Sequence, residues 1–463
     1  MVFRGRAVRT EIAAGPLDQI VKSATQVNSV RPVTFPDILV RNFWTQICFS
    51  AAPLVRPSTL GDATDNHMNH SFTSDGLNCS ARSGPFALSG AISKTVRLAT
   101  GKNVVPVLGL FLCLSIQALA QSNNVTVFAT GLNNPRGLKF GPDGGLFVAE
   151  GGTGGVYPSD GSCADVVPPV GPYTANVTGA RISKIDRHGF RTTVLDNLPS
   201  SQTSAASGSL ISGVADIAFV GDTLYAVLAG AGCSHGVPNI PNGVIRLNRN
   251  GGWSMIANLS AFQMANPVAH PEPDDFEPDG TWYSMVSVGR GRHDDDDHAD
   301  LYALEPNHGE LVKVTTSGSI SRVVDISASQ GHIVPTAMAY HDGNFYVGNL
   351  GTFPITGSSK ILKITPSGQI SVVALGFSTI LGVAFDRTDR MYVLENTTGN
   401  PFPTPFTGQV VRVERSGGRT VIAAGLFLPT AMTFGPDGAL YVSNVGFGPP
   451  PNGLGQILRI SVP

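Results

Sequence analysis

Apolar residues in positions 122–463 fall into short runs that recur in a fixed order. A Gly-Pro-Asp-Gly turn at 141–144 leads into the apolar and aromatic run 146–150, and the same combination returns at 435–444. Proline presets one turn dihedral, aspartate and glycine accept the others, and the run that follows favours a β-strand. The pattern therefore predicts repeated β-hairpins.

Six copies of this strand align on an aromatic residue that is followed three positions later by the residue ending the strand. The strand-ending residues are Glu150, Leu228, Glu305, Asn349, Glu395 and Asn444. Each copy precedes a strand with a basic residue in its third position, and the first five continue through a glycine turn into an outer strand. A period of roughly 40 to 50 residues with about four strands is typical of propeller blades.

The sixth copy has no outer strand, because the chain stops at Pro463. A segment with the matching pattern lies at 125–132, before the first copy. We therefore predict an all-β, six-bladed β-propeller in which this N-terminal strand completes the last blade. Closing the ring in this way removes the sheet edges that an open array would expose.

The chain before the repeats has a different character. Residues 1–102 show no repeat or sustained period, which predicts an irregular leader. Residues 103–121 contain an apolar run and the small-residue site Ala118-Leu119-Ala120, preceded by Lys102. This order is typical of a secretory signal peptide, and the run is short for a membrane span. Either translation starts downstream of Met1, or the run is an internal signal anchor.

Both interpretations predict an exported propeller over 122–463, periplasmic or extracellular, with no membrane span in the mature domain. The leader holds 11 of the 31 basic and 6 of the 33 acidic residues, so the propeller is acidic by about seven charges. That balance argues against a nucleic-acid partner. The propeller contains Cys163 and Cys233; export permits a disulfide between them, and two unpaired loop thiols are the alternative.

The predicted loops divide between two faces of the propeller. Tight turns join the strands on one face. The other, here called the long-loop face, carries the long connections 151–179, 200–212, 229–242, 260–280, 351–359, 397–407 and 446–455. Long irregular loops on a rigid scaffold are where binding sites concentrate. We therefore expect a small molecule or a partner to bind on this face.

Polar strand-ending residues are expected on the same face, beside the central channel. Glu150, Glu305, Asn349, Glu395 and Asn444 offer the oxygen ligands that Ca²⁺ prefers. This predicts a Ca²⁺ site; the alternative is that the side chains cap strand ends and bind channel water.

Histidines give a second group of candidates. His235, His270, His308 and His332 fall on the long-loop face, and the segment 305–310 places His308 between two carboxylates, Glu305 and Glu310. His308 and His332 are the candidates for general acid–base chemistry, if burial shifts a pKa. The alternative is that they are solvated or structural loop residues.

Five segments of residues 121–463 resemble the ScyD/ScyE family of exported β-propeller proteins, known from cyanobacterial gene clusters for the pigment scytonemin. The segments are 134–138, 277–283, 305–310, 331–337 and 348–354. The blade repeat alone is similar to NHL-like or gluconolactonase-like six-bladed propellers. The resemblance implies export and a link to secondary metabolism, and brings no settled reaction. Residues 1–100 and 290–298 depart from the family pattern.

Two functions follow as hypotheses. The first is a binding or scaffold propeller without catalytic activity. Its candidate ligand-binding residues are Arg136, Tyr283, Glu305, Glu310, His308 and His332. The alternative is a Ca²⁺-assisted, lactonase-like hydrolase in which His308 or His332 moves protons. We prefer the first, because the sequence contains no nucleophile motif and no complete metal signature.

Overall fold

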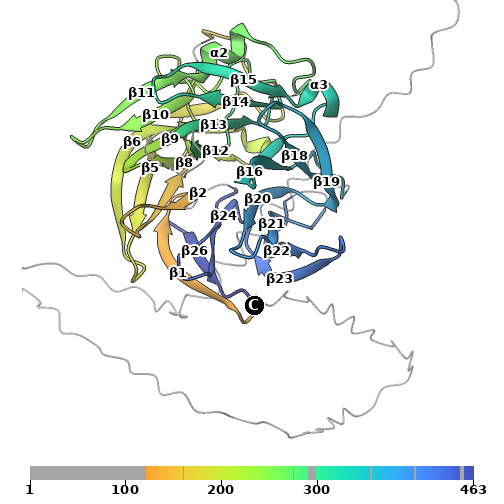
Figure 1. Cartoon of the computed structure of the whole chain (residues 1–463). Coiled ribbons are helices and arrows are strands. Elements are labelled where there is room, and N and C mark those ends of the chain that lie inside the picture. The colour runs from red at the N-terminus through yellow and green to blue at the C-terminus, as the bar shows by residue number, and fades with distance from the viewer. Residues whose placement is uncertain are drawn as a thin grey trace, which may run out of the picture. The chain divides into compact units, whose positions relative to one another are not determined.

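The computed structural model describes residues 121–463, except 160, 275, 290–298, 355–356, 401–402 and 449–452. The predicted leader and signal-like segment therefore lie outside the described residues, apart from Gln121. Six antiparallel sheets surround a central axis in the described part, which confirms the six-bladed β-propeller (Figure 1). The first strands of the blades lie nearest the axis and contact one another from blade to blade around the ring.

Each blade is a sheet of four main strands, with the first strand nearest the axis and the fourth on the outside. Blade 1 contains β2 (Pro135–Phe140), β3 (Leu146–Glu150), β5 (Thr174–Ile185) and β6 (Arg191–Gln202), extended by β4 (Tyr157–Pro158) and β7 (Ile211–Ser212). Blade 2 contains β8 (Val214–Val220), β9 (Thr223–Leu228), β10 (Gly243–Leu247) and β11 (Trp253–Asn258). Blade 3 contains β12 (Ser284–Gly289), β13 (Ala299–Glu305), β14 (Glu310–Val314) and β15 (Ile320–Asp325).

The remaining blades follow the same order. Blade 4 contains β16 (Pro335–His341), β17 (Asn344–Asn349), β18 (Ser359–Ile364) and β19 (Ile370–Phe377). Blade 5 contains β20 (Ile380–Phe385), β21 (Met391–Glu395), β22 (Gly408–Val413) and β23 (Arg419–Leu426). Blade 6 contains β24 (Ala431–Phe434), β25 (Leu440–Asn444), β26 (Gly455–Ile460) and β1 (Val125–Leu132). The short helix η1 (Ala205–Ser207) lies between β6 and β7 of blade 1, while α2 (Leu259–Ala265) connects blades 2 and 3 and α3 (Ser327–Gln330) connects blades 3 and 4.

The N-terminal strand closes the ring as predicted. β1 pairs antiparallel with β26, with Val125 opposite Ile460 and Leu132 opposite Gly455. Just before β1, the Asn124 side chain donates to the carbonyl of Ile422 at 3.0 Å and to that of Ser461 at 2.9 Å. The two ends of the propeller chain are therefore held in one sheet.

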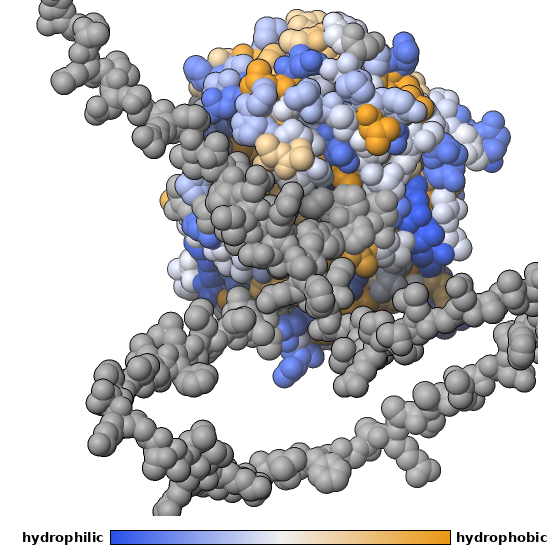
Figure 2. Space-filling view, turned by 180° about the vertical axis from the view of Figure 1, so that it is seen from behind, coloured by the Kyte–Doolittle hydropathy of each residue, from blue (hydrophilic) through white to orange (hydrophobic). Residues whose placement is uncertain are grey.

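The core lies between neighbouring blades. All five residues of β3 and of β25 are buried, because second strands are covered by a blade on each side. Strands buried on both faces read as continuous apolar runs instead of alternating ones. Most residues of the outer strand β19 are half-buried or exposed. On the described surface seen from behind, hydrophilic residues predominate, with separate hydrophobic residues between them (Figure 2).

The two propeller cysteines form a disulfide. Cys163 lies in the loop after β3 and Cys233 in the loop after β9, with their Cα atoms 5.7 Å apart. The bond joins the inserted loops of blades 1 and 2, which decides between the two interpretations left open by the sequence. None of the described helices is long and apolar enough to cross a membrane.

Candidate functional site

The five polar strand-ending residues turn their side chains into their own blades. Glu150 accepts a hydrogen bond from the backbone N–H of Asn133 at 2.6 Å, and Glu395 accepts one from the backbone N–H of Ser378 at 2.6 Å. In blade 6, Asn444 Oδ1 accepts from Phe427 N at 2.9 Å. In all three blades the partner is the loop that enters the first strand.

Blades 3 and 4 repeat this arrangement. Asn349 Nδ2 donates to the Ile333 carbonyl at 2.8 Å, and Glu305 accepts from the Thr281 amide at 2.8 Å. Glu305 also accepts from the backbone amides of the 307–309 turn. Among the described residues, the three carboxylates are not part of any metal-sized cluster of acidic, histidine or cysteine side chains. The geometry favours the strand-capping alternative over a shared Ca²⁺ site.

This capping leads to a prediction about metal dependence. Because the Ser378 N–H and the Gln409 side chain already donate to the two Glu395 oxygens, we expect Ca²⁺ or EDTA to leave the thermal midpoint unchanged. Differential scanning calorimetry of the metal-stripped protein measures this. A Ca²⁺-dependent rise of the midpoint that disappears in Glu395→Gln would contradict this prediction and support a cation site in the channel. Asn349→Asp is a second variant, in which a carboxylate replaces the amide of one proposed ligand.

Arg136 lies at the mouth of the central channel on the long-loop face. It is the second residue of β2 and is 6% exposed. Its Nη1 donates to the Tyr283 hydroxyl at 3.2 Å, and its Nη2 donates to the Ile211 carbonyl. None of the ion pairs found among the described residues includes Arg136. The guanidinium is therefore buried against neutral acceptors.

Aromatic rings flank this guanidinium. Its Cζ lies 5.6 Å from the centre of the Tyr283 ring and 6.0 Å from that of Phe447. The Tyr283 hydroxyl in turn donates to the Thr430 carbonyl at 3.4 Å, so residues of blades 1, 3 and 6 meet across the axis. Burial raises the pKa of Tyr283, which keeps the phenol protonated and able to donate. We call Arg136, Tyr283, Thr430 and Phe447 the axial mouth.

Below the axial mouth is a cavity of about 40 Å³, lined by the first strands of all six blades. Lys139 and Asp216 face it from blades 1 and 2. Asp216 accepts from the Met285 amide at 2.8 Å and from the Ser284 hydroxyl at 3.2 Å. Burial raises the pKa of Asp216, and the nearby Lys139 charge opposes that shift. The cavity has room for ordered water and is too small for an organic ligand.

A separate buried network lies under the loops of blades 1 to 3. Glu277 accepts from the Tyr173 hydroxyl at 2.8 Å and contacts His235 Nε2 at 3.1 Å. The Tyr173 and His235 rings stack with centroids 4.3 Å apart. Burial acts to lower the pKa of His235, but the nearby Glu277 and Asp279 carboxylates act to raise it, and the pKa is raised overall. This network binds three loops together and is closed to solvent at His235.

The predicted histidine candidates adjoin the 305–310 turn. His308 Nε2 lies 2.7 Å from the Glu277 carbonyl, so this nitrogen carries the proton, and the ring packs 4.9 Å from that of Phe276. His332 contacts the Glu272 carboxylate. Burial lowers the pKa of both His308 and His332. His308 is 3% exposed, so its position supports a structural role more than proton transfer to a bound molecule.

The structure therefore brings only part of the predicted ligand-binding set together. Arg136 and Tyr283 meet at the axial mouth. The other four residues, Glu305, Glu310, His308 and His332, lie at strand ends and in loops of blades 3 and 4, where each contacts neighbouring protein groups. Sequence reasoning missed further site residues. These are Asp216, Lys139, Thr430 and Phe447 at the channel, and Tyr173, Glu277 and Asp279 in the loops. A lone aspartate within the apolar run 214–220 was the available signal for Asp216.

Glu310 gives a prediction about pH. Burial raises its pKa from 4.5 to about 7, although Arg322 donates to it and acts against the shift. The folded protein thus holds the proton more tightly than the unfolded chain, so its contribution to stability is present below pH 4.5 and is lost as the pH rises to about 7. We expect Glu310→Gln to remove this loss and to raise the unfolding free energy at pH 8 by about 1 to 3 kcal/mol.

Glutamine matches the shape and neutrality of the protonated Glu310 side chain, whose Oε1 likewise has no hydrogen-bond partner among the described residues. Urea unfolding at pH 5 and pH 8 measures the effect. Glu414→Gln, at a partly exposed carboxylate paired with Arg412, is the control. Equal pH dependence in Glu310→Gln and the wild type would contradict the prediction.

No protein-family model matches the chain, and no curated protein does. Solved structures resemble it at low identity. One is a Bacteroides thetaiotaomicron protein of unknown function, 12% identical, with a TM-score of 0.45 over 74% of this chain and 77% of that one. A Xanthomonas campestris gluconolactonase is 10% identical, with a TM-score of 0.44 over 73% and 89%. The Escherichia coli aldose sugar dehydrogenase is 14% identical, with a TM-score of 0.42 over 73% and 99%. The narrower ScyD/ScyE resemblance stays a prediction.

Proposed function

We propose that this protein is an exported binding propeller that holds the anionic group of a small molecule at the axial mouth. The observation that carries the proposal is the buried Arg136 guanidinium without a carboxylate partner among the described residues. Removing a charge from water costs several kcal/mol unless an opposite charge compensates for it. A bound carboxylate would supply that charge through a bidentate pair, which is the geometry arginine favours.

The surroundings of Arg136 suggest the rest of the ligand. The Tyr283 and Phe447 rings lie beside the guanidinium, so a planar or apolar body attached to the carboxylate would contact them. The cavity of about 40 Å³ beyond the mouth excludes such a body. We therefore place the ligand on the long-loop face, with its carboxylate directed to the axis.

The exported location is part of the same proposal. The Cys163–Cys233 disulfide supports it, because such bonds persist in oxidising compartments. The Ca²⁺-assisted hydrolase gains no support from the strand-capping geometry, and His308 is packed against the Glu277 carbonyl. A second function is therefore not proposed.

Isothermal titration with 2-naphthoate and its neutral analogue 2-naphthamide tests the site. We expect the wild-type protein to bind the carboxylate at least tenfold more tightly than the amide, a difference of about 1.4 kcal/mol. Arg136→Gln should remove that preference, and Phe447→Ala should weaken both probes. Lys360→Gln is the matched control, because it removes a positive charge from a residue that is bonded to Gln330 and lies outside the mouth.

Two results would overturn the proposal. The first is an equal affinity of wild type and Arg136→Gln for 2-naphthoate. The second is a loss of carboxylate preference in Lys360→Gln as large as that in Arg136→Gln, which would indicate a general charge effect. Because Arg136→Gln also removes a hydrogen bond to the Ile211 carbonyl, its thermal midpoint is measured in parallel, and Arg136→Lys should retain part of the carboxylate preference.

A further inference from the structure

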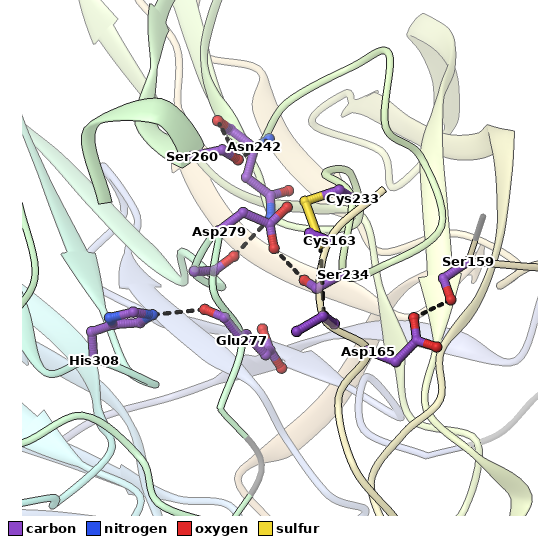
Figure 3. The surroundings of a disulfide bond; sticks show 12 residues. Ser159, Cys163, Asp165, Cys233, Ser234, Asn242, Ser260, Glu277, Asp279 and His308 are labelled. Carbon is purple, nitrogen blue, oxygen red and sulfur yellow. Dashed lines mark hydrogen bonds between the residues drawn. A yellow bond between two sulfur atoms is a disulfide. The ribbon is translucent and has the colours of Figure 1, made fainter. Parts of the chain in front are cut away.

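The disulfide between blades 1 and 2 lies against a buried carboxyl group. One ligand atom each from Cys163, Cys233 and Asp279 lies within 4.8 Å of the other two. Figure 3 shows the Asp279 carboxyl group beside the two sulfur atoms. Among the described residues this is the one such group of acidic, histidine and cysteine side chains that could hold a metal ion.

Asp279 is an unusual neighbour for a disulfide. Its side chain is fully buried, and its Oδ2 has no hydrogen-bond partner among the described residues. Ser234 donates to Oδ1 and fixes the orientation of the carboxyl group. Gly232 leaves room for Oδ2, since a Cβ there would lie 1.8 Å from it. A disulfide has no N–H or O–H to donate to a carboxylate, so Oδ2 is left without a hydrogen-bond donor among the described residues.

We propose that reduction of the Cys163–Cys233 disulfide converts this group into a Zn²⁺ site whose ligands are the two thiolates and Asp279. Zn²⁺ takes thiolate sulfur at about 2.3 Å and carboxylate oxygen at about 2.0 to 2.2 Å in a tetrahedral arrangement. Ligand atoms around such an ion are separated by less than about 4 Å, which small side-chain rotations reach from the observed group. Cys163 and Cys233 are partly exposed, so water can provide the fourth ligand.

The chemistry balances with a dithiol as the reductant. The dithiol gives two electrons and two protons to the disulfide and itself becomes a disulfide, while the bond between the Cys163 and Cys233 sulfurs breaks. Zn²⁺ then binds both sulfurs and displaces the two thiol protons to solvent. The covalent and metal-bound states exclude each other, because both use the same sulfur atoms. In either state the loops of blades 1 and 2 stay joined.

Zinc titration of the full chain tests the proposal. One sample is first reduced with a dithiol, which is then removed under anaerobic conditions, and the other sample is left oxidised. Cd²⁺ serves as a second probe, because its thiolate complexes absorb in the ultraviolet. We expect reduced wild-type protein to bind one more equivalent of either ion than the Cys163→Ser/Cys233→Ser variant, which retains the other cysteines of the chain. The oxidised protein should not bind this equivalent.

Two further variants address the role of the carboxyl group. Asp279→Asn keeps the shape of the side chain and should weaken binding by the reduced protein at least tenfold. Ser234→Ala should weaken it about tenfold, as loss of a group that orients a ligand does. Both retain the disulfide when oxidised, and their oxidised thermal midpoints report whether they fold.

The proposal is overturned if the extra equivalent is absent, if it also binds to oxidised protein, or if Asp279→Asn binds as tightly as the wild type. Failure of the reduced protein to fold in the presence of Zn²⁺, seen as loss of its circular dichroism spectrum, overturns it as well. A Zn²⁺-dependent rise in the thermal midpoint of reduced wild type, absent in the double serine variant, supports it.

Discussion

A chain that begins at Asn133 is expected to lose cooperative unfolding, whereas a chain that begins at Gln121 keeps it. The difference between them is β1 and the residues before it. β1 supplies the outer strand of blade 6, and within it Leu132 is fully buried while Ala129 is 4% exposed. These side chains pack with Tyr441 and Ile457 of the same blade. Deleting β1 removes this core and exposes the hydrogen-bonding edge of β26.

The expected cost is a large fraction of the total stability. Burial of one leucine contributes about 1.5 to 3 kcal/mol, and the strand adds ladder hydrogen bonds and further apolar contacts. We expect a loss of at least about 5 kcal/mol, which is comparable with the whole unfolding free energy of many domains. The exposed edge should also promote aggregation. Circular dichroism during heating and gel filtration measure both effects.

A synthetic peptide of residues 121–132 provides the control, because it can pair with β26 and should restore part of the transition of the chain beginning at Asn133. A chain beginning at Asn133 that melts as cooperatively as the chain beginning at Gln121, at the same temperature, would contradict the proposed contribution of closure to stability.

Removal of the Cys163–Cys233 disulfide is expected to lower the unfolding free energy by about 2 to 4 kcal/mol. The cysteines are 70 residues apart in the sequence, so the bond closes a long loop in the unfolded chain and reduces its conformational freedom. It also holds together the loops that carry Tyr173 and His235. The Tyr173 hydroxyl donates to Glu277, and His235 Nε2 contacts the other oxygen of the same carboxylate.

Guanidinium unfolding of the chain beginning at Gln121 measures this effect, because Cys163 and Cys233 are the cysteines of that chain. The comparison is between wild type and Cys163→Ser/Cys233→Ser, with EDTA present to keep metal away. Dithiothreitol should bring wild type to the stability of the variant and leave the variant unchanged. Equal unfolding free energies of oxidised wild type and the variant would contradict the expected stabilisation by the bond.

The two proposed sites differ in what each requires. Carboxylate binding at the axial mouth depends on Arg136, Tyr283 and Phe447, which approach from three blades. Metal binding depends on Asp279 and the cysteines in the loops of blades 1 to 3. The residues do not overlap, so Arg136→Gln should not alter Zn²⁺ binding and Asp279→Asn should not alter carboxylate preference. The two proposals can therefore fail independently.

The fold could be predicted because its signals are local and repeated. Turn residues such as those at 141–144, and apolar runs such as 146–150, each specify a strand within a few positions, and six repetitions specify a ring. The last repeat lacks an outer strand and the segment 125–132 matches one, so the sequence also indicated that this segment completes blade 6, as the pairing of β1 with β26 shows. Both the number of blades and the closure of the ring could therefore be predicted by counting the repeated strands.

The direction of side chains at the strand ends was a different problem. Glu150, Glu305 and Glu395 were correctly placed at the ends of second strands, but the sequence left open whether they point to the axis or cap the incoming loop. That depends on backbone N–H groups 17 to 24 residues away, such as those of Ser378 and Thr281. Loop paths of this kind are set by packing against the next blade.

The sequence by itself determined the strand order, the closure of the ring and the face that carries the long loops, because turn chemistry and hydrophobic period act over short distances. Only the tertiary structure decided that Arg136 is buried without an acidic partner among the described residues, that Asp216 faces Lys139 across a blade boundary, and that Asp279 lies beside the Cys163–Cys233 bond. These are contacts between blades, and their electrostatic consequences arise when distant segments exclude water from the same place.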